Sequence, residues 1–432
     1  MKPSDVTVVG AGLAGAEAAY QLLKRGFSVT LCEMKPQKYS PAHGLSTFAE
    51  LVCSNSLRSD RIENAVGLLK AEMRTLDSLI LQCADETRVP AGGALAVDRE
   101  GFSRLVTERL AAFPNLTVRR EEITQIPPDP VIIATGPLTS DALSDAIAAM
   151  AGEELHFYDA AAPIVTYDSL DHDKVFAASR YGRGSDYLNC SMTREEYFAF
   201  WHALVEAETA PLHSFETPRV FEGCMPVEVM AKRGELTLAY GPMKPVGIET
   251  GGKRPFAVVQ LRRDNAEGTL YNIVGFQTNL RFGEQKRVFG MIPGLERAEY
   301  VRYGVMHRNT FLQSPKLLNP DYSMRTRPLC FFAGQMTGVE GYVESAASGL
   351  LAGIAMARKL SGASPIDFTS KTAIGALGRY VSAYNGGDFQ PMNITFGIMD
   401  PLPMRVRGKQ ERCQMLAARA MEQIHAMQSD LE

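Results

Sequence analysis

Long apolar runs and paired cysteines are both missing from this sequence of 432 residues. No stretch of about 18 uninterrupted apolar residues occurs, so we expect no membrane-spanning helix. The seven cysteines are odd in number and include no C-x-x-C pair, which argues against a disulfide framework and against a zinc site. We therefore expect no bound metal. Free thiols in a chain without a signal peptide indicate a reducing, cytoplasmic location.

A strong net charge is also missing. The formal net charge is −4, and the apolar and charged fractions of 45% and 22% are those of an ordinary globular protein large enough for two domains. The charge is unevenly distributed, because residues 219–327 hold 17 Lys and Arg against 10 Asp and Glu, a surplus of +7. Chance variation on a solvated surface and a basic face for nucleic acid both fit this surplus.

The N-terminus carries the most informative pattern. A β-branched run at 6–9 predicts a buried parallel strand, which breaks at Gly10, Gly12 and Gly15. An apolar helical pattern follows and ends at Gly26, and a second strand at 29–31 leads to Glu33. Strand, G-x-G-x-x-G, helix, strand and acid in this order predict a dinucleotide site. The pyrophosphate would lie on the helix N-terminus and the acid would bind the adenosine ribose. The expected contacts are Gly10, Ala11, Gly12, Leu13, Ala14, Gly15 and Glu33.

The rest of the chain predicts a discontinuous version of this α/β fold. Residues 63–83 have the spacing of one amphipathic helix, and the strand at 131–133 runs into Thr135 and Gly136, either beside the ligand or in a ligand-free turn. The βαβ rhythm is lost in the middle of the chain and returns with a strand at 329–332, glycines and a long helix over 344–360. We therefore predict a Rossmann-like FAD-binding domain in two parts, 1–156 and 326–432, with an inserted α+β domain at 157–325.

A second glycine fingerprint is absent. One N-terminal fingerprint, with a late strand-glycine-helix unit returning to the same sheet, fits a tightly held FAD, and a nicotinamide would then bind only transiently as reductant. Two cysteines lie in irregular segments where a thiol can reach a ligand: Cys53 in a polar loop, and Cys224 between a glycine and a nearby proline. The alternative for each is an inert, small apolar side chain.

Several long stretches give the chain a specific resemblance. It resembles the folate- and FAD-dependent tRNA uracil methyltransferases, which are short relatives of the bacterial wobble-uridine flavoproteins. The stretches include V-G-A-G-L-A-G-A-E-A-A, P-A-H-G, A-E-L-V-C-S-N-S-L, V-P-A-G-G-A-L-A-V-D-R, C-M-P-V-E, G-P-M-K-P-V-G, R-Y-G-V-M-H-R-N-T and G-V-E-G-Y-V-E-S-A-A-S-G. The larger wobble-uridine relatives have an additional helical C-terminal region, so we expect a sequence of 432 residues to belong with the short relatives.

The resemblance implies a reaction. A methylene group passes from 5,10-methylenetetrahydrofolate through flavin N5 to C5 of the uridine at position 54 of the tRNA T loop, and NADPH or NADH supplies the electrons. Cys224 corresponds to the thiol that attacks C6 of the uracil, and Cys53 to a second active-site thiol. The FAD-binding stretches of the family match the fingerprint residues and also Gly334, Gln335, Gly338, Gly341, Tyr342 and Ser345.

The basic surplus would then hold RNA phosphates. Candidate contacts are Lys244, Arg302, His307 and Arg308, and buried ion pairs are the alternative for the last three. Two other functions stay open from the residues alone. One is a paralogous enzyme that methylates uracil C5 in ribosomal RNA, and the other is a flavin oxidoreductase of a small molecule.

Overall fold

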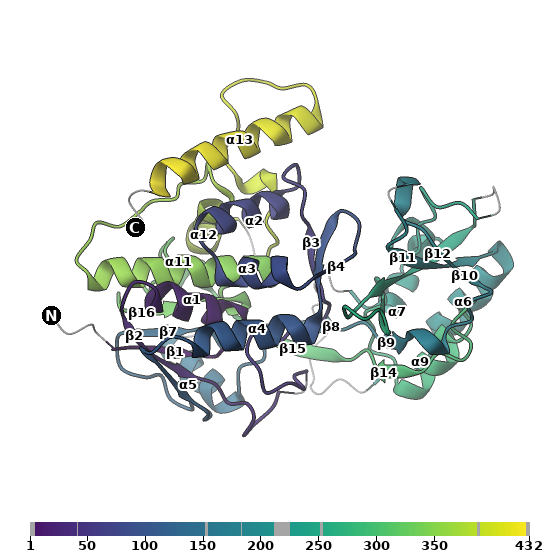
Figure 1. The fold of residues 1–432 in the computed structure, drawn as a ribbon, viewed down its shortest axis with the longest axis horizontal. Helices are drawn as coiled ribbons and strands as arrows, with labels where there is room; N and C mark the ends of the chain where they lie inside the picture. The colour runs from purple at the N-terminus through teal and green to yellow at the C-terminus, as the bar shows by residue number, and fades with distance from the viewer. Residues whose placement is uncertain are drawn as a thin grey trace.

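A computed structural model describes residues 5–40, 42–151, 154–182, 184–210, 225–250, 254–386 and 389–428. Its larger part is built on a five-stranded parallel sheet of order β16-β7-β1-β2-β6 (Figure 1). The strands are β1 (Asp5–Val9), β2 (Ser28–Cys32), β6 (Leu116–Arg119), β7 (Val131–Ile133) and β16 (Cys330–Phe332). The buried parallel strand expected at 6–9 is confirmed, and so are the strands expected at 29–31, 131–133 and 329–332.

Helices cover both faces of this sheet. Val8 packs in the core shared with α1 (Leu13–Leu23) and α11 (Tyr342–Leu360), whereas Val9 packs on the opposite face against α5 (Asp141–Ala151). This alternation follows from the two-residue period of a strand. Helices α1 and α11 touch so closely that a Cβ at Gly349 would lie 2.1 Å from the carbonyl oxygen of Ala14. The late helix is therefore part of the fingerprint domain, as the discontinuous fold requires.

The helix expected over 63–83 is wrong in one respect, because the chain forms two helices, α2 (Ala65–Thr75) and α3 (Leu79–Glu86). Between them Asp77 has a φ of 59°, which interrupts helical geometry. Ser78 then caps α3 by accepting a hydrogen bond from the Leu81 amide. The buried carboxylate of Glu17, on α1, accepts further hydrogen bonds from the first amides of α3. A tertiary contact therefore fixes the break, and apolar spacing alone does not show it.

A small antiparallel sheet of order β3-β5-β4 lies at the end of this domain that faces the second one (Figure 1). Its strands are β3 (Ser56–Ser59), β4 (Arg88–Val89) and β5 (Ala94–Val97), and α4 (Arg99–Ala111) follows directly. Lys70 of α2 is fully buried and donates hydrogen bonds to the carbonyls of Leu57 and Ser59. These contacts fix the strand that begins three residues after Cys53.

The middle of the chain forms a separate layer, an antiparallel sheet of order β10-β11-β12-β13-β9-β14 with helices packed against it. The strands are β9 (Ile164–Thr166), β10 (Val175–Ala177), β11 (Tyr187–Met192), β12 (Ala257–Arg263), β13 (Leu270–Ile273) and β14 (Tyr300–Arg302), and the helices are α6 (Arg194–Glu206), α7 (Val227–Ala231), α8 (Thr237–Tyr240) and α9 (Phe282–Phe289). Helix α6 begins with a capping box formed by Thr193 and Glu196. An α+β unit inserted in the α/β fold is thus observed.

A two-stranded ribbon links the two layers. Strand β8 (Glu154–Ala160) leads into the inserted sheet and pairs with β15 (Met306–Leu312), which leads out of it (Figure 1). The domain limits expected at 156/157 and 325/326 fall within β8 and beyond β15, and they stay predictions.

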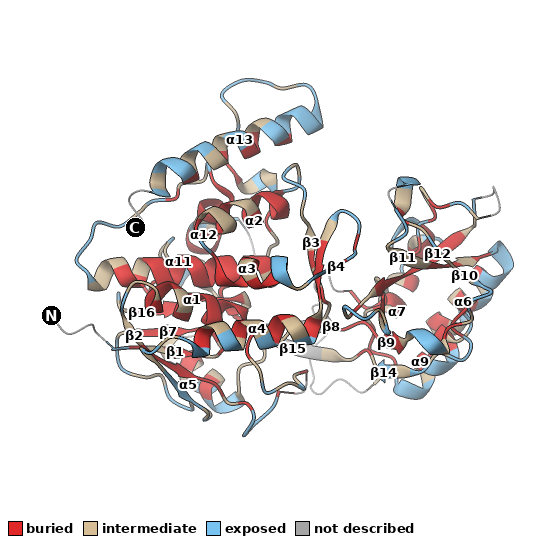
Figure 2. Cartoon of the chain, in the orientation of Figure 1, coloured by how far each residue is buried: buried red, intermediate tan, exposed pale blue. Residues whose placement is uncertain are grey.

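The remaining helices complete the larger part of the molecule. They are α10 (Ser314–Leu317), α12 (Ala373–Ala383) and α13 (Lys409–Gln428), with 3-10 turns at Gln335–Thr337 and Phe396–Ile398. In the inserted domain, 3-10 turns lie at Tyr167–Ser169 and Arg180–Gly182. Figure 2 shows that α12 is largely buried, whereas α13 buries only one face. No helix among the described residues has the length and apolar character needed to cross a membrane.

Candidate functional site: a nucleotide pocket beside a pinned thiol

The sequence-predicted cofactor residues gather at one edge of the parallel sheet. Gly10, Glu33 and Gly334 follow directly, or within two residues, the carboxyl ends of β1, β2 and β16, and Thr135 lies just after β7. Because the carboxyl ends of parallel strands meet at the same edge, these residues converge from four segments of the chain. This edge is where open α/β sheets bind nucleotides.

Glycine is needed at the three fingerprint positions for different physical reasons. A Cβ at Gly10 would lie 2.7 Å from the Ala134 carbonyl oxygen, and one at Gly15 would lie 1.8 Å from the Gly10 carbonyl oxygen, so packing requires both. A Cβ at Gly12 would meet nothing within 4 Å. Gly12 is the N-cap of α1, and it supplies no side-chain cap, while the first turn of α1 holds no acidic residue. Open space above uncapped amides fits a bound pyrophosphate.

Glu33 is fixed at the rim of the same turn. One of its carboxylate oxygens accepts a hydrogen bond of 2.9 Å from the Ala11 amide, and the other accepts one of 3.0 Å from the Lys35 amide. The side chain is buried, and an ionised carboxylate keeps further lone pairs for ribose hydroxyls. The residues present therefore fit the adenosine end of an FAD.

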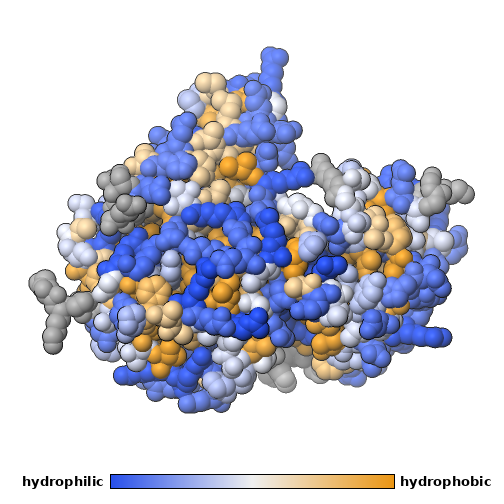
Figure 3. Space-filling view, viewed as in Figure 1, coloured by the Kyte–Doolittle hydropathy of each residue, from blue (hydrophilic) through white to orange (hydrophobic). Residues whose placement is uncertain are grey.

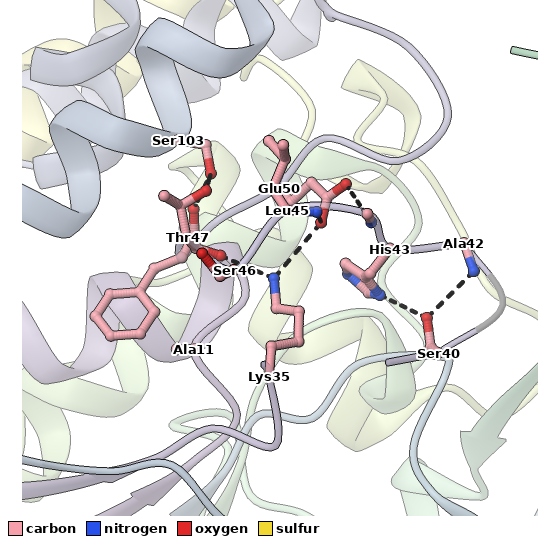
Figure 4. A network of polar contacts seen from close by, with 12 residues as sticks. Ala11, Lys35, Ser40, Ala42, His43, Leu45, Ser46, Thr47, Glu50 and Ser103 are labelled. Carbon is pink, nitrogen blue, oxygen red and sulfur yellow. Dashed lines mark hydrogen bonds and ion pairs between the residues drawn. The ribbon is translucent and has the colours of Figure 1, made fainter. Parts of the chain in front are cut away.

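A pocket opens at this edge and is lined by Gly10, Gly12, Glu33 and Thr135, among others. Polar and charged residues from the loop after β2 also line it: Lys35, His43 and Glu50. Figure 4 shows Lys35 pointing toward Glu50, with 3.6 Å between the ammonium and the carboxylate, while Lys35 also donates to the Thr47 carbonyl. Sequence reasoning missed these three residues.

His43 is held in the same network. Its Nδ1 lies 2.6 Å from the hydroxyl oxygen of Ser40 (Figure 4). Burial, together with the nearby charge of Lys35, lowers the pKa of His43 below its usual value. The neutral imidazole therefore predominates at neutral pH, so this part of the pocket wall offers a hydrogen-bonding ring without a positive charge.

The second predicted cofactor stretch runs from β16 into α11. Gly334, Gly338 and Gly341 all have positive φ values, of 86°, 87° and 107°. At Gly338 the space is also closed, because a Cβ would lie 2.3 Å from the ring of Phe389. Gln335 donates a hydrogen bond of 2.6 Å to Glu340, and the Ser345 amide bonds to the Gly341 carbonyl as α11 begins. The loop is thus shaped by contacts within the protein up to the first turn of α11, where Val343, Glu344 and Ser345 are buried.

The structure brings Cys53 and Tyr342 together. The hydroxyl oxygen of Tyr342 accepts hydrogen bonds from the amides of Cys53 at 2.7 Å and Ser54 at 3.2 Å. Burial raises the pKa of Tyr342, so its hydroxyl stays protonated. Cys53 is partly exposed, whereas Cys32, Cys83, Cys190, Cys330 and Cys413 are buried, as expected for structural cysteines. The Cys53 loop is therefore tied to the first residue of α11.

The inserted domain holds the other side of this loop. Arg262 of β12 is buried and donates to the Ser54 hydroxyl at 2.6 Å and to the Asn55 side-chain oxygen at 3.1 Å. Asn55 in turn donates to the carbonyls of Val97 and Arg263. The guanidinium groups of Arg99, Arg262 and Arg302 all act electrostatically on Cys53. The loop is therefore a polar junction between the two domains.

A buried ion pair closes the junction. Arg99 of α4 and Asp264, just after β12, form two hydrogen bonds, of 2.9 and 3.2 Å, and both side chains are almost fully buried. Arg99 also donates to the Leu51 carbonyl, two residues before Cys53. The segment that carries this thiol is thus fixed from three directions.

Other predicted residues are dispersed. Cys224 lies outside the described residues, and so do the side chains of His307 and Arg308, whose backbone belongs to β15. Lys244 is exposed, whereas Arg302 donates to the Ala42 carbonyl at 3.0 Å and so bridges the two domains. Part of the positive charge at 219–327 does not reach solvent as free charge. Arg262 is buried, and Arg281, Arg287 and Arg327 form ion pairs. The four RNA contacts stay predictions.

Comparison with known proteins decides the family. Residues 5–364 match the family model described as glucose inhibited division protein A. The chain belongs to that family. Among its members, the chain is 60% identical over 430 residues to "Methylenetetrahydrofolate--tRNA-(uracil-5-)-methyltransferase TrmFO" of Bacillus licheniformis, covering 99% of each chain. The proteins of the same name from Pelotomaculum thermopropionicum and Bacillus subtilis are 60% and 59% identical, again over essentially the full length. The resemblance inferred from the sequence is confirmed, and the chain lies in the TrmFO branch of the GidA family.

Solved structures of the family show the same fold. Aquifex aeolicus GidA, in two crystal forms, superposes with TM-scores of 0.71 and 0.72 at 15% and 16% identity. The match covers 100% and 99% of this chain but 76% of the GidA chain. The predicted Rossmann-like fold with an inserted domain is therefore confirmed.

Proposed function

We propose that this protein is a methylenetetrahydrofolate-dependent tRNA (uracil-5-)-methyltransferase that uses FAD. The observation that carries the proposal is the full-length identity of about 60% to relatives of that name. The pocket geometry supports it, since the open space at Gly12, the uncapped first turn of α1 and the fixed Glu33 fit an FAD. FAD, when bound, supplies the one-carbon and hydride transfer chemistry, with NADPH or NADH as the source of electrons.

The protein has to make uracil C5 nucleophilic. A thiolate adds to C6, the C5–C6 double bond opens, and the electron pair gives C5 enolate character. After C5 gains the one-carbon unit, a base removes the C5 proton and the thiolate leaves from C6. We assign the addition to Cys224 and a supporting acid–base role to Cys53, whose backbone amide donates a hydrogen bond to the Tyr342 hydroxyl oxygen.

The target is proposed to be position 54 in the T loop of tRNA. That base lies within folded RNA, so it has to be turned out into the site, at a cost of about a few kcal/mol. The junction between the two domains, where the Cys53 loop contacts β12, is the place where RNA held by one domain meets the pocket of the other. We also propose a cytoplasmic location, which agrees with the finding that none of the six described cysteines forms a disulfide.

The test combines purified protein, unmodified tRNA, methylenetetrahydrofolate and NADPH, followed by digestion of the RNA. We expect 5-methyluridine, and none when S-adenosylmethionine replaces the folate. A ribosomal RNA fragment serves as competing substrate. Cys224→Ser is expected to abolish methylation with FAD content unchanged; methylation at the normal rate by this variant would remove Cys224 from its assigned role.

A further inference from the structure

The segment 400–412, which leads from the buried core into α13, carries an unusual set of charges. It holds Arg405, Arg407, Lys409 and Arg412 against the two carboxylates of Asp400 and Glu411. All six side chains are exposed, and within the part of the chain that the structure describes none of them forms an ion pair. Other exposed arginines in the domain behave differently: Arg88, Arg104 and Arg119 each contact a carboxylate.

The same segment forms a groove and is held in place. Three of its arginines, Arg405, Arg407 and Arg412, line the groove together with apolar residues, including Phe396, Met399 and Met404. Met404 is 62% exposed. The start of the segment is anchored, because Arg419 of α13 donates to the carbonyls of Asp400 and Pro401 at 2.6 and 2.9 Å. A fixed basic groove with exposed apolar side chains suits a nucleic acid, whose phosphates and bases need both kinds of contact.

The 400–412 segment lies on the side of the domain from which β3 leads back to the Cys53 loop. Helix α13 packs on α2, and Gln428 near its C-terminus donates to the carbonyl of Thr75 at the C-terminus of α2. The two helices therefore run in the same direction, and α13, about 30 Å long against about 16 Å for α2, extends beyond the N-terminus of α2. That end of α2 follows β3, the strand that begins just after Cys53. Figure 1 shows the loop before α13 above this strand, and Figure 3 shows that the lobe at this place carries both hydrophilic and hydrophobic residues.

We propose that the 400–412 segment is a phosphate-binding surface for the body of the tRNA, outside the T arm that enters the pocket. This inference rests on the proposed function for the identity of the RNA. The base is delivered at the domain junction, while the arginines of the segment hold a part of the same molecule that lies further from the reacting atoms. A contact of this kind contributes affinity and orientation and leaves the chemistry unchanged.

The test variant is R405Q/R407Q/R412Q. The matched control is R104Q/K174Q/R379Q, which removes the same charge from exposed cations that are ion-paired elsewhere. Because the test variant neutralises three phosphate-binding side chains, the slope of log K for full-length tRNA against log salt is expected to fall in magnitude by about 2–3, and KM for tRNA to rise at least about tenfold. FAD content, kcat and turnover of an isolated T-arm hairpin are expected to stay within twofold of the unsubstituted enzyme.

Three outcomes would overturn the proposal: an unchanged salt slope, an equal change in the control variant, or an equal loss with the hairpin. If the test variant loses binding to anionic phospholipid vesicles but binds tRNA like the unsubstituted protein, the surface binds membranes and not tRNA. Should no variant and no unsubstituted protein methylate any RNA, the proposed function fails. The tRNA binding isotherms would still decide the surface on their own.

Discussion

Arg262 offers the sharpest test of how the thiol loop is held. The change Arg262→Gln removes two charge-assisted hydrogen bonds, to Ser54 at 2.6 Å and to Asn55 at 3.1 Å. Each such bond stabilises a structure by about 1.5–3 kcal/mol. Asn55 keeps its hydrogen bonds to the Val97 and Arg263 carbonyls in the variant. We therefore expect the closed form of the loop to lose stabilisation near the lower limit for two such bonds, about 3 kcal/mol. Since about 1.4 kcal/mol is a factor of ten, the open form of the loop would become about 100-fold more populated.

The assay is alkylation of Cys53 in the native protein, followed by mass spectrometry, with the buried Cys83 and Cys190 as internal references. We expect Cys53 to react at least about tenfold faster in the variant and kcat to fall, while FAD content is retained. Arg263→Gln is the matched control, because Arg263 contacts the loop through its carbonyl and not through its side chain. The reasoning is refuted if Arg262→Gln leaves both Cys53 reactivity and kcat within twofold of the unsubstituted protein.

Three further predictions concern the nucleotide pocket and the core. Gly12→Ala should fold with normal thermal stability but bind FAD at least tenfold more weakly, because its Cβ meets no protein atom and points into the space assigned to the pyrophosphate; normal FAD affinity by titration would contradict that assignment. Gly349→Ala should do the opposite, lowering the free energy of unfolding by about 1–3 kcal/mol, since its Cβ would lie 2.1 Å from the Ala14 carbonyl oxygen; an unchanged denaturation midpoint would show that α1 and α11 are not in such close contact. Burial raises the pKa of Glu72 to about 8, above its unfolded value of 4.5, so the folded state binds more protons than the unfolded state between these pH values. The free energy of unfolding should therefore decrease as pH rises from about 4.5 to 8, by at most about 1.4 kcal/mol per pH unit. Glu72→Gln should flatten this dependence in urea titrations, and an identical slope in both proteins would rule Glu72 out as its source.

Local patterns predicted the nucleotide half well. The first strand, the fingerprint turn, α1 and Glu33 are consecutive in the sequence, and each has a residue-level signature that does not depend on distant contacts. The late strand and α11 could be assigned to the same domain because glycines and small residues indicate a helix that packs closely on its neighbour. The contact of Gly349 with Ala14 is an example.

Predictions that depended on distant contacts were less complete. The break between α2 and α3 depends on Glu17, more than 60 residues away, so apolar spacing extended one helix across it. The junction around Cys53 joins Asn55 to Arg262, 207 residues apart, and neither residue has a local signature for this role. The polar pocket residues Lys35, His43 and Glu50 gave a weak signal, because they lie in the loop directly after the fingerprint acid. Such a loop is more often only solvated, and the burial that makes these residues informative is visible only in the structure.

The origin of the methyl carbon tests the central claim most directly. The protein would be supplied with unmodified tRNA, NADPH, unlabelled S-adenosylmethionine and methylenetetrahydrofolate that carries two deuterons on its methylene group. Mass spectrometry of the digested RNA should then show 5-methyluridine whose methyl group holds both deuterons, at position 54 only. A methyl group without deuterium, or no methylated uridine from a preparation loaded with FAD, would contradict the account.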